Sequence, residues 1–191
     1  SLFHGVASKK PRHWLLPVRA CEAVGGTLEQ AIPAATAIAC SHIGIILIDD
    51  MLDADPRGEY HRIGMPAGVN MASALQAASL EVIAAFEGKS HVKLTALQNF
   101  NRMFLTTALG QLWDVNIPKD ESDYWRIIQK KSSPFFGSAL QLGALLGGAP
   151  IRIAGKLREL GCLYGEMIQI HDDLNDTMAV PANPDWLQKR K

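Results

Sequence analysis

The sequence predicts an all-α protein, and three observations support this prediction. Apolar residues recur at helical spacing along almost the whole chain, and the alternation typical of strands is scarce. The Asn-Gly and Asp-Gly pairs that favour tight hairpins are absent from the sequence. Two stretches, 31–48 and 139–146, are apolar on more than one face, which is typical of helices buried inside a bundle.

Helix-breaking residues divide the chain into its expected elements. Gly25-Gly26 ends the first helix, and the stretch from Pro56 to Pro66 separates the second from the third. Gly88 then separates the third helix from the fourth. The predicted helices are 11–24, 28–53, 68–88, 91–113, 121–131, 133–147 and 151–177.

The later elements follow the same logic. Pro118 ends the fourth helix, and either Asp120 or Ser122 is suited to cap the fifth, because short polar side chains accept hydrogen bonds from free backbone N–H groups. Gly147-Gly148-Ala149-Pro150 separates the last two helices. Frequent Ala and Gly residues allow these helices to pack closely.

Charge and composition exclude several classes of protein. The 191 residues contain 19 Lys+Arg and 19 Asp+Glu, so the formal net charge is zero, whereas nucleic-acid-binding proteins normally show a basic excess. Hydrophobic residues make up 48% and charged residues 20%, an ordinary globular balance. The length suits one domain, which we expect to span 1–191.

Compartment and membrane association can also be predicted. The three cysteines are odd in number and lack CxxC spacing, which argues against a disulfide framework and favours a reducing cytoplasm. The longest apolar run near residue 45 is Ile43–Ile48, too short to span a bilayer, and the N-terminus lacks the pattern of a signal peptide. We therefore expect a cytoplasmic protein without a membrane span.

Two acidic clusters are the most informative feature of the sequence. Asp49-Asp50-Met51-Leu52-Asp53 and Asp172-Asp173-Leu174-Asn175-Asp176 share the pattern DDxxD. Each cluster ends an apolar predicted helix. One such cluster alone is typical of a solvated helix end, but two in the same setting indicate a shared function.

Helical geometry indicates what this function requires. Residues four apart lie on one face, so Asp49 and Asp53 point together, as do Asp172 and Asp176. Carboxylates a turn apart repel each other, and at a helix C-terminus they also oppose the helix dipole. Mg²⁺ relieves this conflict, because it binds carboxylate oxygens and shares its remaining positions with water and substrate phosphates.

With both clusters in place, residues 8–176 resemble the trans-isoprenyl diphosphate synthases, the family of farnesyl and geranylgeranyl diphosphate synthases. The matches share the order and spacing of the family's motifs. The basic motif is matched at Lys9 and Arg12, the His before the first cluster at His42, the following Arg-Gly at Arg57-Gly58, Gly-Gln-x-x-Asp at Gly110–Asp114, the Lys-Thr helix start at Lys131-Ser132, and the Gln before the second cluster at Gln169.

This resemblance implies an isoprenoid-synthase-type helical bundle around a central cavity, with the two acidic clusters facing each other across its mouth. It also implies a homodimer. Family members are longer, with further helices before the basic motif and after the second cluster, so we expect the single domain here to lack some of them.

The resemblance further implies a Mg²⁺-dependent prenyltransferase that joins isopentenyl diphosphate to an allylic diphosphate. Catalytic roles fall to Asp49, Asp50, Asp53, Lys131, Asp172 and Asp173. Metal binding falls to the same five aspartates and Asp176. Lys131 and Arg57 contact the allylic phosphates, Ser132 and Gln169 position substrate, and Lys9, Arg12 and His42 bind isopentenyl diphosphate.

Product length is predicted from the residues just before the first cluster. In the family, bulky side chains there close the floor of the pocket and stop elongation early. Gly44 and Ile45 are not aromatic, so we expect products of C20 or longer.

Two alternatives on the same scaffold stay open at this stage. A terpene cyclase would keep the acidic clusters and lose contacts to isopentenyl diphosphate, and the basic motif is matched only in part. A non-catalytic or regulatory paralogue would normally lose a cluster, and this sequence keeps both. A nucleotide-binding enzyme finds no support, since the sequence contains neither a P-loop nor GxGxxG.

Overall fold

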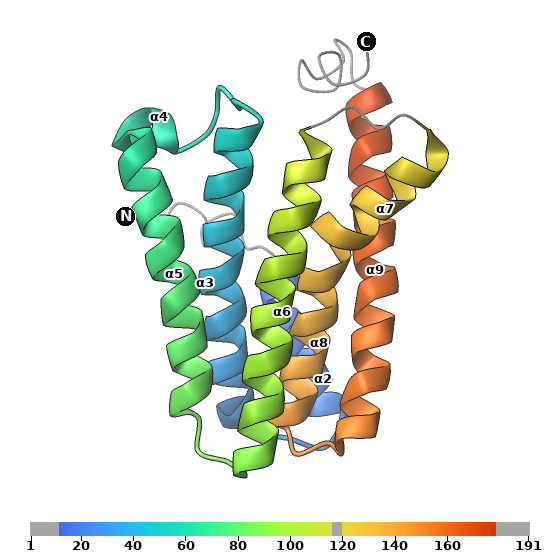
Figure 1. Cartoon of the computed structure of the whole chain (residues 1–191). Helices are drawn as coiled ribbons and strands as arrows, with labels where there is room; N and C mark the ends of the chain where they lie inside the picture. The colour runs from blue at the N-terminus through green and yellow to red at the C-terminus, as the bar shows by residue number, and fades with distance from the viewer. Residues whose placement is uncertain (1–11, 116–119, 179–191) are drawn as a thin grey trace.

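A computed structural model describes residues 12–115 and 120–178 and shows a bundle of long helices (Figure 1). Helices α3, α5, α6, α8 and α9 run along a common axis, and α7 crosses them obliquely near one end. The elements are η1 (Arg12–Leu15), α2 (Leu16–Ala23), α3 (Leu28–Leu52), α4 (Tyr60–Ile63), α5 (Met65–Ala85), α6 (Ser90–Asp114), α7 (Glu121–Lys131), α8 (Ser133–Leu146) and α9 (Ile151–Met178). The described residues form no strand, which confirms the predicted all-α class.

The predicted helices are all present, with small differences at their ends. Helix α5 begins at Met65, earlier than predicted, because Pro66 fits the first helical turn, where its missing N–H costs nothing. Asp120 caps α7, and its side chain accepts a hydrogen bond from the backbone N–H of Asp123 at 2.9 Å. The short helix α4 was not predicted, because four residues are too few to show a periodic pattern.

Helix α8 forms the centre of the bundle. Every residue from Ser133 to Leu146 is buried, and α2, α3, α6, α7 and α9 pack around it. Its Ala139, Leu142 and Leu145 join the main apolar core with residues of α3, α5 and α6. The apolar character of this segment on all faces is thus explained by burial on all sides.

Glycines set the distances between α8 and its neighbours. A Cβ at Gly143 would overlap the backbone of Pro17 in α2. On α9, Cβ atoms at Gly161 and Gly165 would overlap α8 near Phe136. These helices therefore touch backbone to backbone, which fixes the position of α9 beside α8.

Helix α3 spans Leu28–Leu52, close to the predicted range 28–53. A capping box between Thr27 and Gln30 starts the helix. By length and apolar composition, Leu28–Leu52 could also cross a membrane. The core helix of a soluble protein has the same properties, and 56% of the apolar part of α3 is buried inside the bundle.

The close approach at Gly143 gives a stability prediction with a matched control. Gly143→Ala should lower the free energy of unfolding by about 1–3 kcal/mol, because the added methyl group must push α2 away from α8. Gly155→Ala, on α9, should raise it by about 1 kcal/mol, because nothing lies within 4 Å of the new Cβ and Ala favours the helix. Urea denaturation followed by circular dichroism measures both changes, and shifts of the same sign would contradict this account.

Candidate active site

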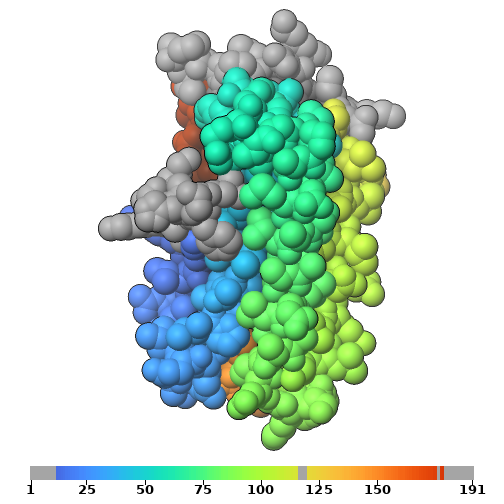
Figure 2. All heavy atoms as spheres, turned by 90° about the vertical axis from the view of Figure 1, so that its left-hand side faces the viewer, coloured from blue at the N-terminus to red at the C-terminus, as the bar shows by residue number. Residues whose placement is uncertain are grey.

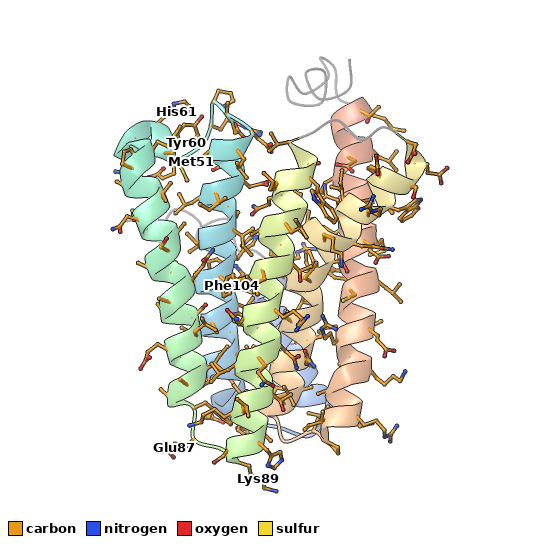
Figure 3. All side chains as sticks on the ribbon, viewed as in Figure 1. Met51, Tyr60, His61, Glu87, Lys89 and Phe104 are labelled. Atoms are coloured by element: carbon orange, nitrogen blue, oxygen red, sulfur yellow. The ribbon has the colours of Figure 1, made fainter. Side chains whose placement is uncertain are left out.

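Both acidic clusters lie at the same end of the bundle. Helices α3 and α9 run in the same direction, so their C-terminal turns, which carry Asp49–Asp53 and Asp172–Asp176, end on the side where α7 joins α8 (Figure 1). In Figure 3, Met51 marks this end, and Glu87 and Lys89 mark the opposite one. The α7–α8 junction, Lys131-Ser132, contacts both acidic helices.

Lys131 binds the first acidic cluster. Its Nζ lies 3.0 Å from Asp49 Oδ1 and 2.6 Å from Asp114 Oδ2, and its side chain is only 14% exposed. Burial alone would lower the pKa of Lys131, but Asp49, Asp114 and Asp53 together outweigh burial and raise this pKa above its usual range. Lys131 is thus a fixed positive charge inside the acidic end of the bundle.

Gly110 explains how α6 contributes to this ion pair. A Cβ at position 110 would overlap the backbone of Lys130 and Lys131, so only glycine lets the end of α7 lie against α6. Gln111 then donates from Nε2 to Asp49 Oδ1 and to the Ile45 carbonyl, each at 3.3 Å. The Gly-Gln-x-x-Asp pattern therefore positions Asp49 and Lys131.

The second acidic cluster is held by a separate network. Ser132 Oγ donates to Gln169 Oε1, and Gln169 Nε2 donates to Asp173 Oδ1 at 3.0 Å. The Tyr124 hydroxyl donates to the other oxygen of Asp173, Oδ2, at 2.6 Å. The α7–α8 junction is in this way hydrogen-bonded to α9 as well as paired with α3.

His42 lies in an aromatic setting on α3, seven residues before Asp49. It accepts a hydrogen bond at Nδ1 from Trp14 Nε1 at 3.0 Å, and its ring stacks on Phe135 with centroids 5.1 Å apart. Burial, reinforced by nearby His13, lowers the pKa of His42 to about 4. Because indole N–H only donates, neutral His42 carries its proton on Nε2 and is a hydrogen-bond donor there.

Asp50 is half-buried and lies near other carboxylates. Burial, followed by the charges of Asp55 and Asp49, raises the pKa of Asp50 to about 6, although Arg57 opposes this effect. Arg57 itself binds Asp55, with Nη2 2.7 Å from Oδ2 and Nε 3.0 Å from Oδ1. The guanidinium of Arg57 therefore lies beside the first cluster but is directed at a neighbouring loop residue.

The structure brings together some predicted site residues and not others. Asp49 and Lys131 form one contact set, and Ser132, Gln169 and Asp173 form another. Arg12 is exposed in η1. Lys9 and the side chain of Asp176 lie outside the described part of the chain.

Several residues at this site received no role in the sequence analysis. Asp114 and Gln111 were noted only as part of a motif, although their spacing places them one turn apart on one face of a helix. Tyr124 precedes Lys131 by seven residues, two turns on the same face of α7, and this spacing is the signal that could have found it. Nothing in the sequence pairs Trp14 with His42.

Comparison with known proteins gives the same picture. Residues 6–186 match the family described as Polyprenyl synthetase. A geranylgeranyl diphosphate synthase of Methanosarcina mazei is 30% identical over 175 residues, covering 85% of this chain and 53% of the relative. A geranylfarnesyl diphosphate synthase of the same organism is 25% identical over 167 residues, covering 83% of this chain and 55% of the relative.

Solved structures share the fold. The geranylgeranyl pyrophosphate synthetase from the archaeon Geoglobus acetivorans matches with a TM-score of 0.83 at 24% identity, covering 92% of this chain and 60% of that one. A polyprenyl synthase from Caulobacter crescentus, complexed with calcium and isoprenyl diphosphate, matches with a TM-score of 0.77 at 23% identity, covering 88% of this chain and 53% of that one.

An all-α bundle that brings two DDxxD helix ends to one side defines an isoprenoid-synthase-type protein. The chain belongs to the polyprenyl synthetase family. It spans about half the length of the curated relatives it matches, 53% for the first of those named above.

The raised pKa of Asp50 gives a pH-dependent prediction. Since its folded pKa of about 6 exceeds the ordinary value of 3.8, ionised Asp50 destabilises the fold, with the penalty absent below about pH 4 and complete above about pH 6. With EDTA present, Asp50→Asn should raise the unfolding free energy by about 1–2 kcal/mol at pH 7, allowing for solvent screening of this half-buried group. Urea titrations at pH 4 should show no difference from wild type, and an equal gain at both pH values would contradict the assignment.

Proposed function

We propose that this chain carries the catalytic end of a prenyltransferase that condenses isopentenyl diphosphate with an allylic diphosphate, head to tail. The observation that carries the proposal is the convergence of two DDxxD helix ends on one buried lysine junction, Lys131-Ser132. The relatives named geranylgeranyl and geranylfarnesyl diphosphate synthases support the same reaction class.

The donor chemistry of the site fits magnesium bound together with a diphosphate. Carboxylate oxygens are the ligands that Mg²⁺ prefers, and burial, followed by the charges of Asp55 and Asp49, raises the pKa of Asp50. Among the described residues, no three His, Cys, Asp or Glu side chains form a ready-made metal centre. Substrate phosphate oxygens would therefore complete the coordination, with Asp49, Asp50 and Asp53 on one side and Asp172 and its neighbours on the other. When bound, magnesium supplies positive charge to the departing pyrophosphate.

The difficult step of this reaction is the separation of charge at the allylic carbon. Its C–O bond breaks and the electron pair leaves with pyrophosphate. Lys131 is suited to stabilise this leaving group, because it is a buried ammonium held in place by Asp49 and Asp114. Arg57 would add a second charge if its guanidinium turned from Asp55 to a phosphate.

The second substrate would bind on the side of η1. Lys9 and Arg12 would contact the diphosphate of isopentenyl diphosphate, and neutral His42 would donate from Nε2. The double bond of isopentenyl diphosphate then attacks the allylic cation, and loss of a proton to the released pyrophosphate restores the alkene. Gln169 and Ser132 act by keeping the second acidic helix against this site.

The proposal on product length depends on Ile45 more than on Gly44. Gly44 faces α5, where an added Cβ would lie 3.3 Å from the Ala72 carbonyl oxygen, so it serves helix packing. Ile45 packs against the main core. We keep the proposal that products are C20 or longer.

The homodimer is likewise proposed, and exposed apolar side chains support it. Helix α6 exposes Leu94, Leu105, Leu109 and Leu112 in a row at helical spacing, and α5 exposes Met65 and Val69. Figure 2 looks onto α5 and shows α6 running beside it. An apolar surface of this kind is typical of a protein interface.

The direct test is incubation with labelled isopentenyl diphosphate, an allylic diphosphate and magnesium, followed by product analysis. We expect the label in a longer prenyl diphosphate, and no product in excess chelator. Asp49→Asn and Asp172→Asn should each lower turnover by at least about a hundredfold while circular dichroism stays unchanged. An enzyme that consumes the allylic substrate but not isopentenyl diphosphate would be a cyclase and would contradict the proposal.

A second substitution tests the depth of the pocket. Ile45→Phe should shorten the longest product by at least one isoprene unit, because the larger ring occupies space next to the first acidic cluster. Chromatography of dephosphorylated products measures the change, and the first condensation should continue. A wild-type enzyme that stops at C15, unaffected by Ile45→Phe, would show that another residue sets the length.

A further inference from the structure

We infer that Tyr124 and Asp173 form a positioning pair that fixes the C-terminal turn of α9, so that Tyr124 is a positioning residue for the second acidic cluster. The pair itself is a feature of the folded chain, and its effect on magnesium binding rests on the proposed function.

The hydrogen bonds of Asp173 carry the inference. Its Oδ2 accepts from the Tyr124 hydroxyl at 2.6 Å and its Oδ1 accepts from Gln169 Nε2 at 3.0 Å. Each carboxylate oxygen is therefore held by a donor from the protein, one on α7 and one on α9. Hydrogen bonds from neutral donors to a carboxylate are short and strong, and two of them fix the orientation of the carboxyl plane.

Helix geometry places Asp173 on the packing side of α9. Gly161, Gly165, Gln169 and Asp173 follow at intervals of four residues and lie on one stripe. The first two touch α8, and Gln169 touches Ser132 at the α7–α8 junction. Asp173 continues this stripe onto α7. Asp172 lies about 100° further round the helix and shares its face with position 176.

The pair is connected to the charged centre of the site. Tyr124 and Lys131 lie seven residues apart on α7, and Lys131 binds Asp49. Tyr124 thus attaches α9 to the same helix that Lys131 attaches to α3. Loss of the tyrosine hydroxyl should release the end of α9 without disturbing the ion pairs of Lys131.

Hydrogen–deuterium exchange tests the pair in substrate-free protein with EDTA. Tyr124→Phe removes the hydroxyl and keeps the ring, so backbone amides of 169–175 should exchange at least about tenfold faster, and those of α8 should not change. Tyr164→Phe is the matched control, because the Tyr164 ring packs on Phe136 while its hydroxyl makes no hydrogen bond among the described residues. Unchanged exchange in Tyr124→Phe would overturn the inference.

Calorimetry of magnesium binding, with an unreactive allylic thiolodiphosphate present, tests the effect of the pair on the second cluster. Tyr124→Phe should weaken magnesium binding by about five- to tenfold, because the C-terminal turn of α9 is no longer fixed, and Tyr164→Phe should leave it unchanged. Wild-type magnesium binding in Tyr124→Phe would overturn this role of Tyr124. If the wild-type protein does not bind magnesium with the diphosphate, the proposed function fails, and the exchange experiment still decides whether the pair exists.

Discussion

The acidic end of the bundle depends on one buried cation. Lys131 compensates Asp49 and Asp114, which come from two different helices and would otherwise repel each other in a partly desolvated site. An ion pair of this kind contributes little net stability, because burial of its charges is costly, but it specifies one arrangement of α3, α6 and α7. The neighbouring Ser132 extends the same junction to α9. The two acidic helices, α3 and α9, are therefore positioned by contacts to two consecutive residues, Lys131 and Ser132.

Close backbone contacts between helices make this arrangement possible. Gly110 lets the end of α7 lie directly on α6, and Gly161 and Gly165 let α9 lie directly on α8. Gly110 stands directly before Gln111 and about one turn before Asp114, and Gly165 stands about one turn before Gln169. Close backbone packing thus fixes the position of each polar group along the bundle axis. Side-chain packing alone would define this position less well.

Much of this was predictable from sequence, for identifiable reasons. The helices and their order followed from apolar periodicity and from breakers such as Gly25-Gly26 and Gly147-Gly148, and the two DDxxD motifs located the acidic end. The partners of the motif residues were not predictable, since contacts such as Trp14 with His42 or Tyr124 with Asp173 join positions far apart in the chain. The close approach of Gly44 to α5 was not predictable for the same reason, because helical spacing alone does not place α5.

The central claim is that Lys131 fixes the end of α3 at the α7–α8 junction, which also holds the end of α9 through Ser132. It can be measured as a distance between spin labels at the exposed positions Leu52 and Leu174, in a Cys162→Ser background, by pulsed electron resonance. The account predicts one narrow distance distribution in the parent protein and in the control Lys130→Met, whose side chain is exposed. Lys131→Met should broaden or shift that distribution. An unchanged distribution in Lys131→Met would contradict the account.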